Sequence, residues 1–324
     1  MISRRLFAWS ATDVTRRTGA FGSAALQRRH AATHERNVVQ SPFGKVDIPR
    51  KSVTEYIFEG YEKYANQPAI RSYTFGMTYE MVKRMACGLL SQKGCAMRKH
   101  DVLGLLLPNI PEFVPALHGG LMAGLAVTFA NPLYTPEEVC RQFENAGVTV
   151  IVTLPMLLPV AELFKLKVKQ YKGTICVGGK HDFEKNIYGF EQFLMENHTS
   201  ELPTIDCDQT AILPYSSGTT GLPKGVELTH YNLVANLAQG SHPTISKYFQ
   251  PEYINKKETI LTIPPYFHIY GLNGILHSVL KSKNHIVSIP SASVQPTTHH
   301  SKPRYVLSSV SSVAPYSVNH FSAS

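Results

Sequence analysis

A short segment near the middle of the chain concentrates residues that bind phosphate. Positions 215–225 read YSSGTTGLPKG, and within 216–225 there are four hydroxyl side chains, three glycines and one lysine. Glycines let backbone N–H groups approach an anion closely, hydroxyls donate hydrogen bonds, and Lys224 supplies a mobile positive charge. The segment therefore predicts a polyphosphate site. It is not a Walker A loop, because Lys224 is followed by Gly225 instead of Ser or Thr.

The alternative for this segment is a flexible Gly/Ser linker on the surface. A linker of that kind does not need Pro223 and Lys224 between flanking strands, so the phosphate site is the better interpretation. A second candidate site is PPYFHIYGL at 264–272, where His268 stands among aromatic residues. Taken alone, His268 is better explained as a packed core histidine in an aromatic turn.

The elements around these segments alternate between helical and extended patterns. Apolar spacings of three and four predict helices, with Thr54 and Thr78 suited to be N-caps, and short apolar runs predict buried strands. We expect helices at 54–65, 78–92, 111–123, 136–146, 156–171, 189–196 and from about 231, and strands at 102–107, 125–129, 148–153, 174–178 and 210–214. This alternation is typical of an α/β fold with a layered parallel sheet, which places ligands at the carboxyl ends of its strands.

Several segments together resemble one known family. The run YSSGTTGLPKGVELTHYNLVAN (215–236) is similar to the phosphate-loop signature of the adenylate-forming (AMP-binding) superfamily, which includes acyl-CoA synthetases, luciferases and 4-coumarate–CoA ligases. PPYFHIYGL resembles the aromatic-His substrate motif of that superfamily. LPNIPEF (107–113) and ANPLYTPEEV (130–139) are similar to its 4-coumarate–CoA ligase and luciferase branch. The resemblance covers about 52–290.

The resemblance implies a chemistry and a set of site residues. Members activate a carboxylic acid with ATP and Mg²⁺ to an acyl-adenylate and pass the acyl group to a thiol, usually coenzyme A. The ATP-binding residues implied are Ser216, Ser217, Gly218, Thr219, Thr220, Gly221 and Lys224. Thr219 would also hold the metal. His268, Tyr270 and Gly271 would bind the acid, and His268 and Lys224 would be catalytic.

The pattern departs from the family towards the carboxyl end. Gly274 stands where the plant coumarate enzymes carry a serine, which leaves the acid, fatty or aromatic, unspecified. After Pro290 the family lysine is replaced by Ser291, and 291–324 is a Ser-rich stretch without an acidic residue. We therefore expect a partial AMP-binding domain at 50–290, an aberrant tail at 291–324 and no C-terminal lid domain. A non-catalytic nucleotide-binding or interaction fragment is the alternative function.

Composition bounds the remaining function classes. Residues 1–36 hold seven arginines against two acidic residues, so +5 of the net charge of +9 lies there and +4 on the other 288 residues. We therefore expect small-molecule partners and no nucleic acid. The Arg-rich segment predicts a mitochondrial transit peptide, with a disordered basic arm as the other interpretation and peroxisome or cytoplasm as alternative locations. Localisation of a fluorescent fusion with and without 1–36 tests this.

Other function classes fit the sequence less well. The uncharged run at 113–136 is interrupted by Pro115 and Pro132, so we expect a buried helix and strand there and no integral membrane span. Five scattered cysteines predict free thiols. The sequence has no GxSxG motif, which disfavours a Ser-His-Asp hydrolase.

Overall fold

The computed structural model describes residues 44–216, 223–250, 253 and 255–289. The predicted arm at 1–36, the tail at 291–324 and the middle of the phosphate segment, 217–222, lie outside these described residues. The chain divides into two units, Met1–Lys45 and Val46–Ser324, and the elements below belong to the second.

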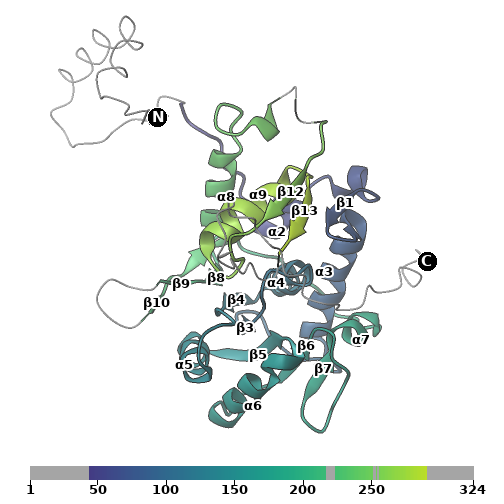
Figure 1. Ribbon diagram of the computed structural model, residues 1–324, viewed down its shortest axis with the longest axis vertical. Coiled ribbons are helices and arrows are strands. Elements are labelled where there is room, and N and C mark those ends of the chain that lie inside the picture. Colours follow the sequence, from purple (N-terminus) through teal and green to yellow (C-terminus); the bar gives the residue numbers. More distant parts are fainter. Residues whose placement is uncertain (1–43, 217–222, 251–252, 254, 290–324) are drawn as a thin grey trace, which may run out of the picture. The chain divides into compact units, whose positions relative to one another are not determined.

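A seven-stranded sheet forms the larger layer of this unit (Figure 1). In order across the sheet its strands are β11 (Leu228–Thr229), β8 (Thr210–Leu213), β4 (Ala126–Phe129), β3 (Val102–Leu105), β5 (Val148–Thr153), β6 (Gly173–Cys176) and β7 (Ile187–Gly189). All neighbouring pairs are parallel except β11 with β8. The predicted layered parallel sheet is therefore confirmed.

Helices cover both faces of this sheet, which explains why its central strands are unbroken apolar runs. The helices on one face are α3 (Phe75–Leu90), α4 (Phe113–Met122) and α7 (Phe190–Met195), and those on the other are α5 (Pro136–Ala146) and α6 (Leu158–Lys167). On the second face, Phe143 and Phe164 pack edge to face, with ring centroids 5.9 Å apart. The sheet is thus dry on both sides.

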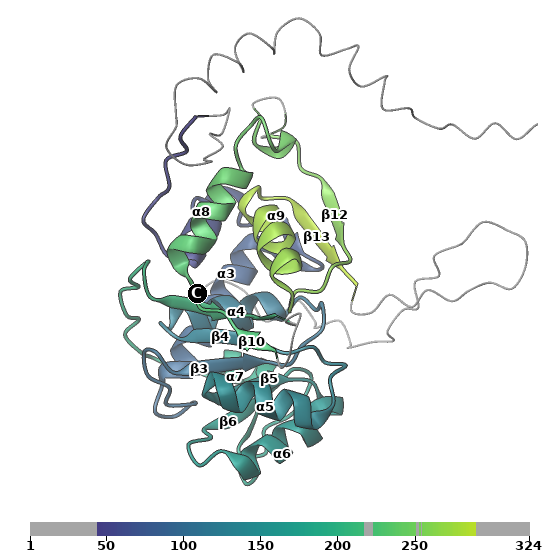
Figure 2. The same cartoon turned by 90° about the vertical axis from the view of Figure 1, so that its left-hand side faces the viewer.

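A second, four-stranded sheet lies beyond α3 and α4, so that these two helices are enclosed between two sheets (Figure 2). Its strands in order are β12 (Thr259–Thr262), β13 (His285–Ser288), β1 (Pro68–Ile70) and β2 (Tyr73–Thr74). β12 and β1 both run parallel to β13, and β2 is antiparallel to β1. We did not predict this sheet from the sequence, because its strands are two to four residues long and far apart in the chain.

Helix boundaries correct the sequence prediction in several places. α2 (Val53–Phe58) is capped by Ser52, and α3 is capped by Thr74, so Thr54 and Thr78 are not N-caps. The predicted helix 54–65 is divided by Gly60, whose φ of 69° ends it; a 3₁₀ turn at Tyr61–Tyr64 follows. The predicted helix 156–171 comprises a 3₁₀ turn, Pro155–Leu157, and α6, which ends at Lys167.

Helix α5 has the predicted limits, 136–146, because its end signals are local. Thr135 accepts from the N–H of Glu138, and the Glu138 carboxylate accepts from the N–H of Thr135, which forms a capping box. Pro136 occupies the first turn, and Gly147 ends the helix at a φ of 73°.

The C-terminal end of α2 is stabilised by two lysines from the other end of the described chain. Lys281, the last residue of α9 (Ser278–Lys281), donates from Nζ to the carbonyl of Tyr56 at 2.7 Å. Lys283 donates to the carbonyl of Ile57 at 2.6 Å. Cations favour the carbonyl end of a helix, and burial lowers the pKa of Lys283 to about 8. These contacts fix α2 against the layer that carries α9.

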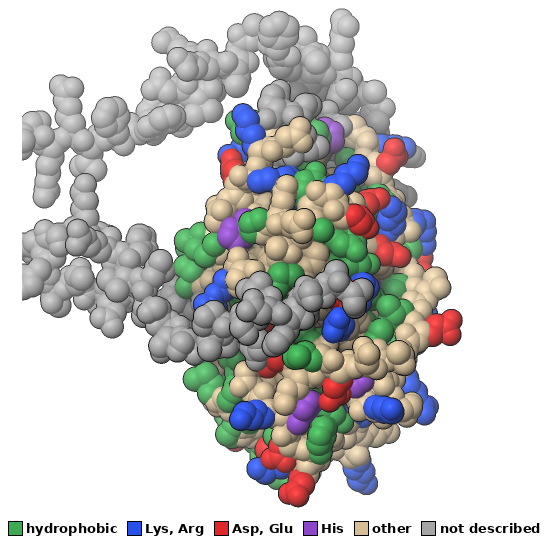
Figure 3. Space-filling model, turned by 90° about the vertical axis from the view of Figure 1, so that its right-hand side faces the viewer, with side chains coloured by type: hydrophobic (Ala, Val, Ile, Leu, Met, Phe, Trp, Pro, Cys, Tyr) green, Lys and Arg blue, Asp and Glu red, His purple; other side chains and the backbone are tan. Residues whose placement is uncertain are grey.

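The surface carries both signs of charge. On the face shown in Figure 3, Lys and Arg side chains alternate with Asp and Glu, and no continuous basic area is visible among the described residues. None of the helices within the described ranges is long and apolar enough to cross a membrane. The uncharged run at 113–136 instead forms α4 and β4, as expected.

Three fully buried histidines lie within the helical layer. They are His118 on α4, His230 at the start of α8 (His230–Gly240) and His277 at the end of a π-helix (Tyr270–His277). The rings of His118 and His277 are 5.1 Å apart between centroids. Burial lowers the pKa of His230 to about 4 and that of His277 to about 3, and it places the pKa of His118 well below its usual value. All three are neutral at pH 7.

These histidines should make the protein acid-sensitive. As the pH falls, the unfolded chain takes up protons near pH 6.5, whereas folded His230 and His277 stay neutral until pH 3–4. Stability should therefore fall between pH 7 and 5 by about 2 kcal/mol for each histidine. The measurement is the free energy of unfolding of the chain in urea at both pH values.

The matched variants separate this effect from general acid denaturation. His230 Nδ1 accepts a hydrogen bond from the N–H of Val53 at 3.2 Å. His230→Asn keeps an acceptor for this N–H and should make the stability less dependent on pH. His100→Gln, at an exposed position, should leave the slope unchanged. Equal slopes in all three proteins would contradict this assignment.

Candidate active site

The predicted phosphate segment leaves the large sheet as a hairpin. Beyond the carboxyl end of β8, β9 (Tyr215–Ser216) pairs antiparallel with β10 (Lys224–Gly225), and Ser216 stands directly opposite Lys224. The chain then returns through β11 beside β8. The structure therefore brings Ser216 and Lys224 together at the sheet edge where ligands of parallel α/β folds bind. Ser217, Gly218, Thr219, Thr220 and Gly221 lie outside the described residues.

The root of the hairpin is anchored to α5. The Tyr215 hydroxyl donates to Asn145 Oδ1 at 2.5 Å and lies 3.3 Å from the carbonyl of Gln142. Burial raises the pKa of Tyr215, so this hydroxyl keeps its proton. Gly225 lies against the ring, and a Cβ at this position would lie 3.2 Å from Tyr215 Cζ, a tight contact. The two strands that carry Ser216 and Lys224 thus start from a fixed base.

The Lys224 side chain is available for an anion. It is exposed, and none of the described carboxylates lies within ion-pair distance of it. Ser216, across the hairpin, is also exposed. A cation and a hydroxyl that face each other without a competing acid suit a phosphate group.

The second motif forms the turn between β12 and the π-helix. Tyr266 is fully buried at its centre, with its hydroxyl 2.5 Å from Thr262 Oγ1 and its ring 5.5 Å from that of Phe113. Gly271 is buried, and a Cβ at this position would collide with the carbonyl of Pro265. Gly271 thus allows a close backbone contact, and its predicted role in binding the acid stays a prediction.

One side chain from the large sheet fixes this turn. Asn109, four residues beyond the end of β3, donates from Nδ2 to the carbonyl of Pro264 at 3.0 Å. Its Oδ1 accepts from the N–H of Tyr266 at 2.8 Å. The Asn109 side chain therefore binds the turn as a neighbouring strand would. In the sequence, the LPNIPEF segment indicated a family resemblance, but it gave no indication that Asn109 contacts this turn.

His268 is held with one ring nitrogen occupied. It is exposed, and its Nδ1 accepts from the N–H of Tyr270 at 3.3 Å. A neutral imidazole that accepts at Nδ1 carries its proton on Nε2. The outer nitrogen of His268 is thus a donor, which suits a carboxylate oxygen. Its catalytic role stays a prediction.

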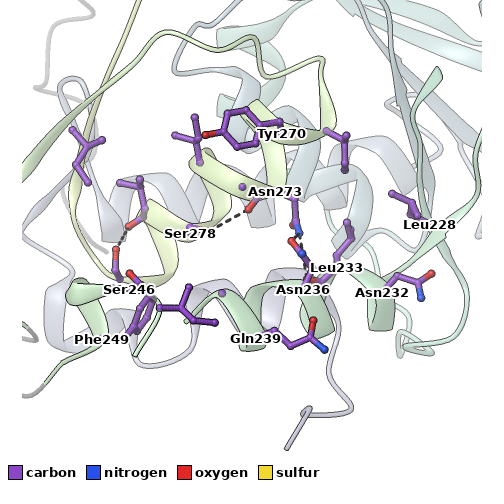
Figure 4. A pocket seen from close by; sticks show the side chains of 18 of the residues that line it. Leu228, Asn232, Leu233, Asn236, Gln239, Ser246, Phe249, Tyr270, Asn273 and Ser278 are labelled. Atoms are coloured by element: carbon purple, nitrogen blue, oxygen red, sulfur yellow. Dashed lines mark hydrogen bonds between the residues drawn. The ribbon is translucent and has the colours of Figure 1, made fainter. Parts of the chain in front are cut away.

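A cleft of about 940 Å³ lies between α8, the π-helix and β12 (Figure 4). Tyr270, which is 62% exposed, lines it together with Leu228 of β11, the strand that follows the hairpin. His268 does not belong to its lining. Apolar side chains such as Phe249 and Ile260 form much of the wall, and none of the described residues that line it is charged. The cleft can therefore hold an uncharged organic group.

Four carboxamides also line the cleft, and we did not predict them. Asn232, Asn236 and Gln239 share one face of α8, and Asn273 comes from the π-helix. The spacing of residues 232, 236 and 239 is the sequence signal for a shared helix face. This signal is missed when only charged or nucleophilic residues are considered as site candidates. These amides give the apolar cleft a hydrogen-bonding wall.

Metal-binding groups are sparse in the described part of the chain. The one set of three donor residues close enough for a single ion there is Asp206, Cys207 and Asp208. It precedes β8, at the opposite end of that strand from the hairpin. Thr219, the predicted metal residue, lies outside the described residues.

Removal of the Asn109 amide should loosen the turn that carries His268. Asn109→Ala leaves the Tyr266 N–H and the Pro264 carbonyl without this partner, and we expect a loss of about 2 kcal/mol in stability. Limited chymotrypsin digestion should cut faster at the aromatic residues 266–270. Asn131→Ala, which removes one hydrogen bond within its own loop, should not change cleavage there. Unchanged protection of 266–270 in Asn109→Ala would contradict this role.

Comparison with solved structures gives the fold. An anthranilate–CoA ligase solved with anthranoyl-AMP superposes with a TM-score of 0.66 at 20% identity, covering 76% of this chain and 46% of that one. A long-chain-fatty-acid–CoA ligase from Archaeoglobus fulgidus gives a TM-score of 0.64 at 24% identity, covering 76% and 49%.

Sequence comparison gives the family. 4-Coumarate–CoA ligase 3 of Arabidopsis thaliana is 34% identical over 258 residues, which is 76% of this chain and 43% of the relative. A probable 4-coumarate–CoA ligase 1 of Dictyostelium discoideum is 31% identical over 271 residues, covering 77% and 47%. The chain thus spans less than half the length of these curated relatives. The family model described as AMP-binding enzyme matches residues 57–306, and the chain therefore belongs to the AMP-binding enzyme family.

Proposed function

We propose that this protein activates a carboxylic acid with ATP to an acyl-adenylate and transfers the acyl group to coenzyme A. The observation that carries the proposal is the hairpin that sets Lys224 opposite Ser216 at the carboxyl edge of the parallel sheet. Family membership supports it, because its relatives include 4-coumarate–CoA ligases. The uncharged cleft beside β11 supports an organic acid as the substrate.

The reaction requires a carboxylate to approach a polyphosphate although both are anions. In the first step a carboxylate oxygen attacks the α-phosphorus, the acyl–O–P bond forms, and the P–O bond to pyrophosphate breaks. Lys224 would neutralise charge on the phosphate oxygens, and the Ser216 hydroxyl would donate a hydrogen bond to them. Mg²⁺, when bound, would supply further positive charge to the phosphates.

The acid would be oriented by the second motif. Nε2–H of His268 would donate to one carboxylate oxygen, while the organic part would enter the cleft beside Tyr270. In the second step the thiol of coenzyme A attacks the acyl carbonyl, and AMP leaves with the electrons of the acyl–O bond. The thiol proton passes to solvent. A mitochondrial location, from residues 1–36, stays a prediction.

Acid-dependent exchange of pyrophosphate into ATP tests this function. The chain should catalyse the exchange with at least one acid of a panel of fatty and aromatic acids, because formation of an acyl-adenylate is reversible. Lys224→Ala should weaken ATP binding in calorimetry by about tenfold or more, since a charge-assisted contact to phosphate is lost.

The same two assays provide a control for Lys224→Ala and the results that would contradict the proposed function. Lys63→Ala, at an exposed lysine outside the hairpin, should bind ATP like the parent chain. Thermal stabilisation by ATP without exchange for any acid would replace the ligase by the nucleotide-binding fragment. Equal ATP affinity of Lys224→Ala and the parent would remove Lys224 from the site.

A further inference from the structure

The hairpin that carries Ser216 and Lys224 is not part of the large sheet. β9 and β10 form a separate two-stranded sheet with two residues in each strand. A two-stranded hairpin without further packing is only marginally stable in water. The orientation of this hairpin must therefore be fixed by contacts with other elements.

The two faces of the hairpin have different surroundings. Side chains of directly opposite residues share a face, and neighbours along a strand point to opposite faces. Ser216 and Lys224 thus lie on one face, and Tyr215 and Gly225 lie on the other. Because Gly225 has no side chain, the Tyr215 ring covers this second face. The first face, with the cation and the hydroxyl, is left for a phosphate group.

The Tyr215 hydroxyl ties the second face to helix α5. It donates to Asn145 Oδ1 at 2.5 Å, and the carbonyl oxygen of Gln142 lies 3.3 Å away. Among the described residues, these are the side-chain hydrogen bonds that the hairpin strands make with other elements. The tyrosine ring is rigid, so a fixed hydroxyl restricts the strand to which the ring is attached.

Helix α5 is a firm support for this contact. The Gln142 side chain is 7% exposed and donates from Nε2 to the carbonyl of Phe129, the last residue of β4, at 2.9 Å. Phe143 packs against Phe164 of α6. Asn145, three residues after Gln142, therefore stands on a helix whose place relative to the large sheet is fixed. Its side chain passes this fixed place on to the hairpin.

We propose that Asn145 is a positioning residue of the nucleotide site. By accepting from the Tyr215 hydroxyl, Asn145 sets the orientation of the hairpin and so places the Lys224 ammonium and the Ser216 hydroxyl for a phosphate group. Asn145 lies on the Tyr215 side of the hairpin and acts through that residue. The proposal rests on the proposed function, because it concerns the ATP bound at this hairpin.

Calorimetric titration of the full chain with ATP tests this role. Asn145→Ala should bind ATP about fivefold more weakly, which is within the range for the loss of one hydrogen bond. Tyr215→Phe should bind about as weakly, and the double variant no more weakly than either, because both changes remove the same contact. The thermal stability of Asn145→Ala without ATP should not fall, since alanine favours a helix more than asparagine does.

A second set of variants separates positioning from a general structural effect. In a Lys224→Ala background, the Asn145→Ala change should alter the ATP affinity by less than about twofold, since the cation that Asn145 places is gone. A residue that merely supports the fold would lower the affinity equally in both backgrounds. Asn66→Ala, which removes an exposed amide before β1, should leave the affinity unchanged in both.

The results distinguish a failure of this role from a failure of the proposed function. Equal ATP affinity of Asn145→Ala and the parent chain, or an equal loss with and without Lys224, would overturn the positioning role alone. Losses that add up in the double variant of Asn145 and Tyr215 would also overturn it, because the two residues would then act separately. A parent chain that binds no ATP would overturn the proposed function itself.

Discussion

The two sheets of this protein are tied together at the candidate site by the side chain of Asn109. It belongs to the chain that leaves the parallel sheet, and it binds the turn that leaves the second sheet. Apolar packing of the Tyr266 ring against Phe113 is not directional, whereas the Asn109 hydrogen bonds are. With them, the segment that carries His268 and Tyr270 has a defined position relative to β3. The chemistry proposed for the site depends on this connection.

The parallel sheet could be predicted from the sequence because its signals are local. Apolar runs marked β3 and β5, and α5 carried its own capping box and terminal glycine. Ser216 and Lys224, which lie in the two strands of the hairpin, were predicted as site residues from composition and resemblance. Their placement opposite each other could not be predicted, because the pairing register depends on the flanking strands.

The second sheet and the carboxamide wall required the structure. β1 and β13 pair across more than two hundred residues, and no local pattern marks such a partner. Asn236 and Asn273 are ordinary polar residues in the sequence, and their significance arises only from the contact between α8 and the π-helix. The N-caps were assigned wrongly for a related reason. Ser52 and Thr54, like Thr74 and Thr78, are neighbouring hydroxyl residues that are both suited to cap a helix. Only the backbone conformation shows which of the two is the N-cap.

The π-helix at Tyr270–His277 gives the cleft an unusual kind of variability. Its hydrogen bonds span five residues instead of four, so it contains more residues than an α-helix of equal length. Deletion of one residue would tighten it into an α-helix that still leads into α9. The preceding side chains would then rotate by about 100° about the helix axis relative to α8. A single change in chain length would thus exchange the whole set of groups facing the cleft, something that no point substitution achieves.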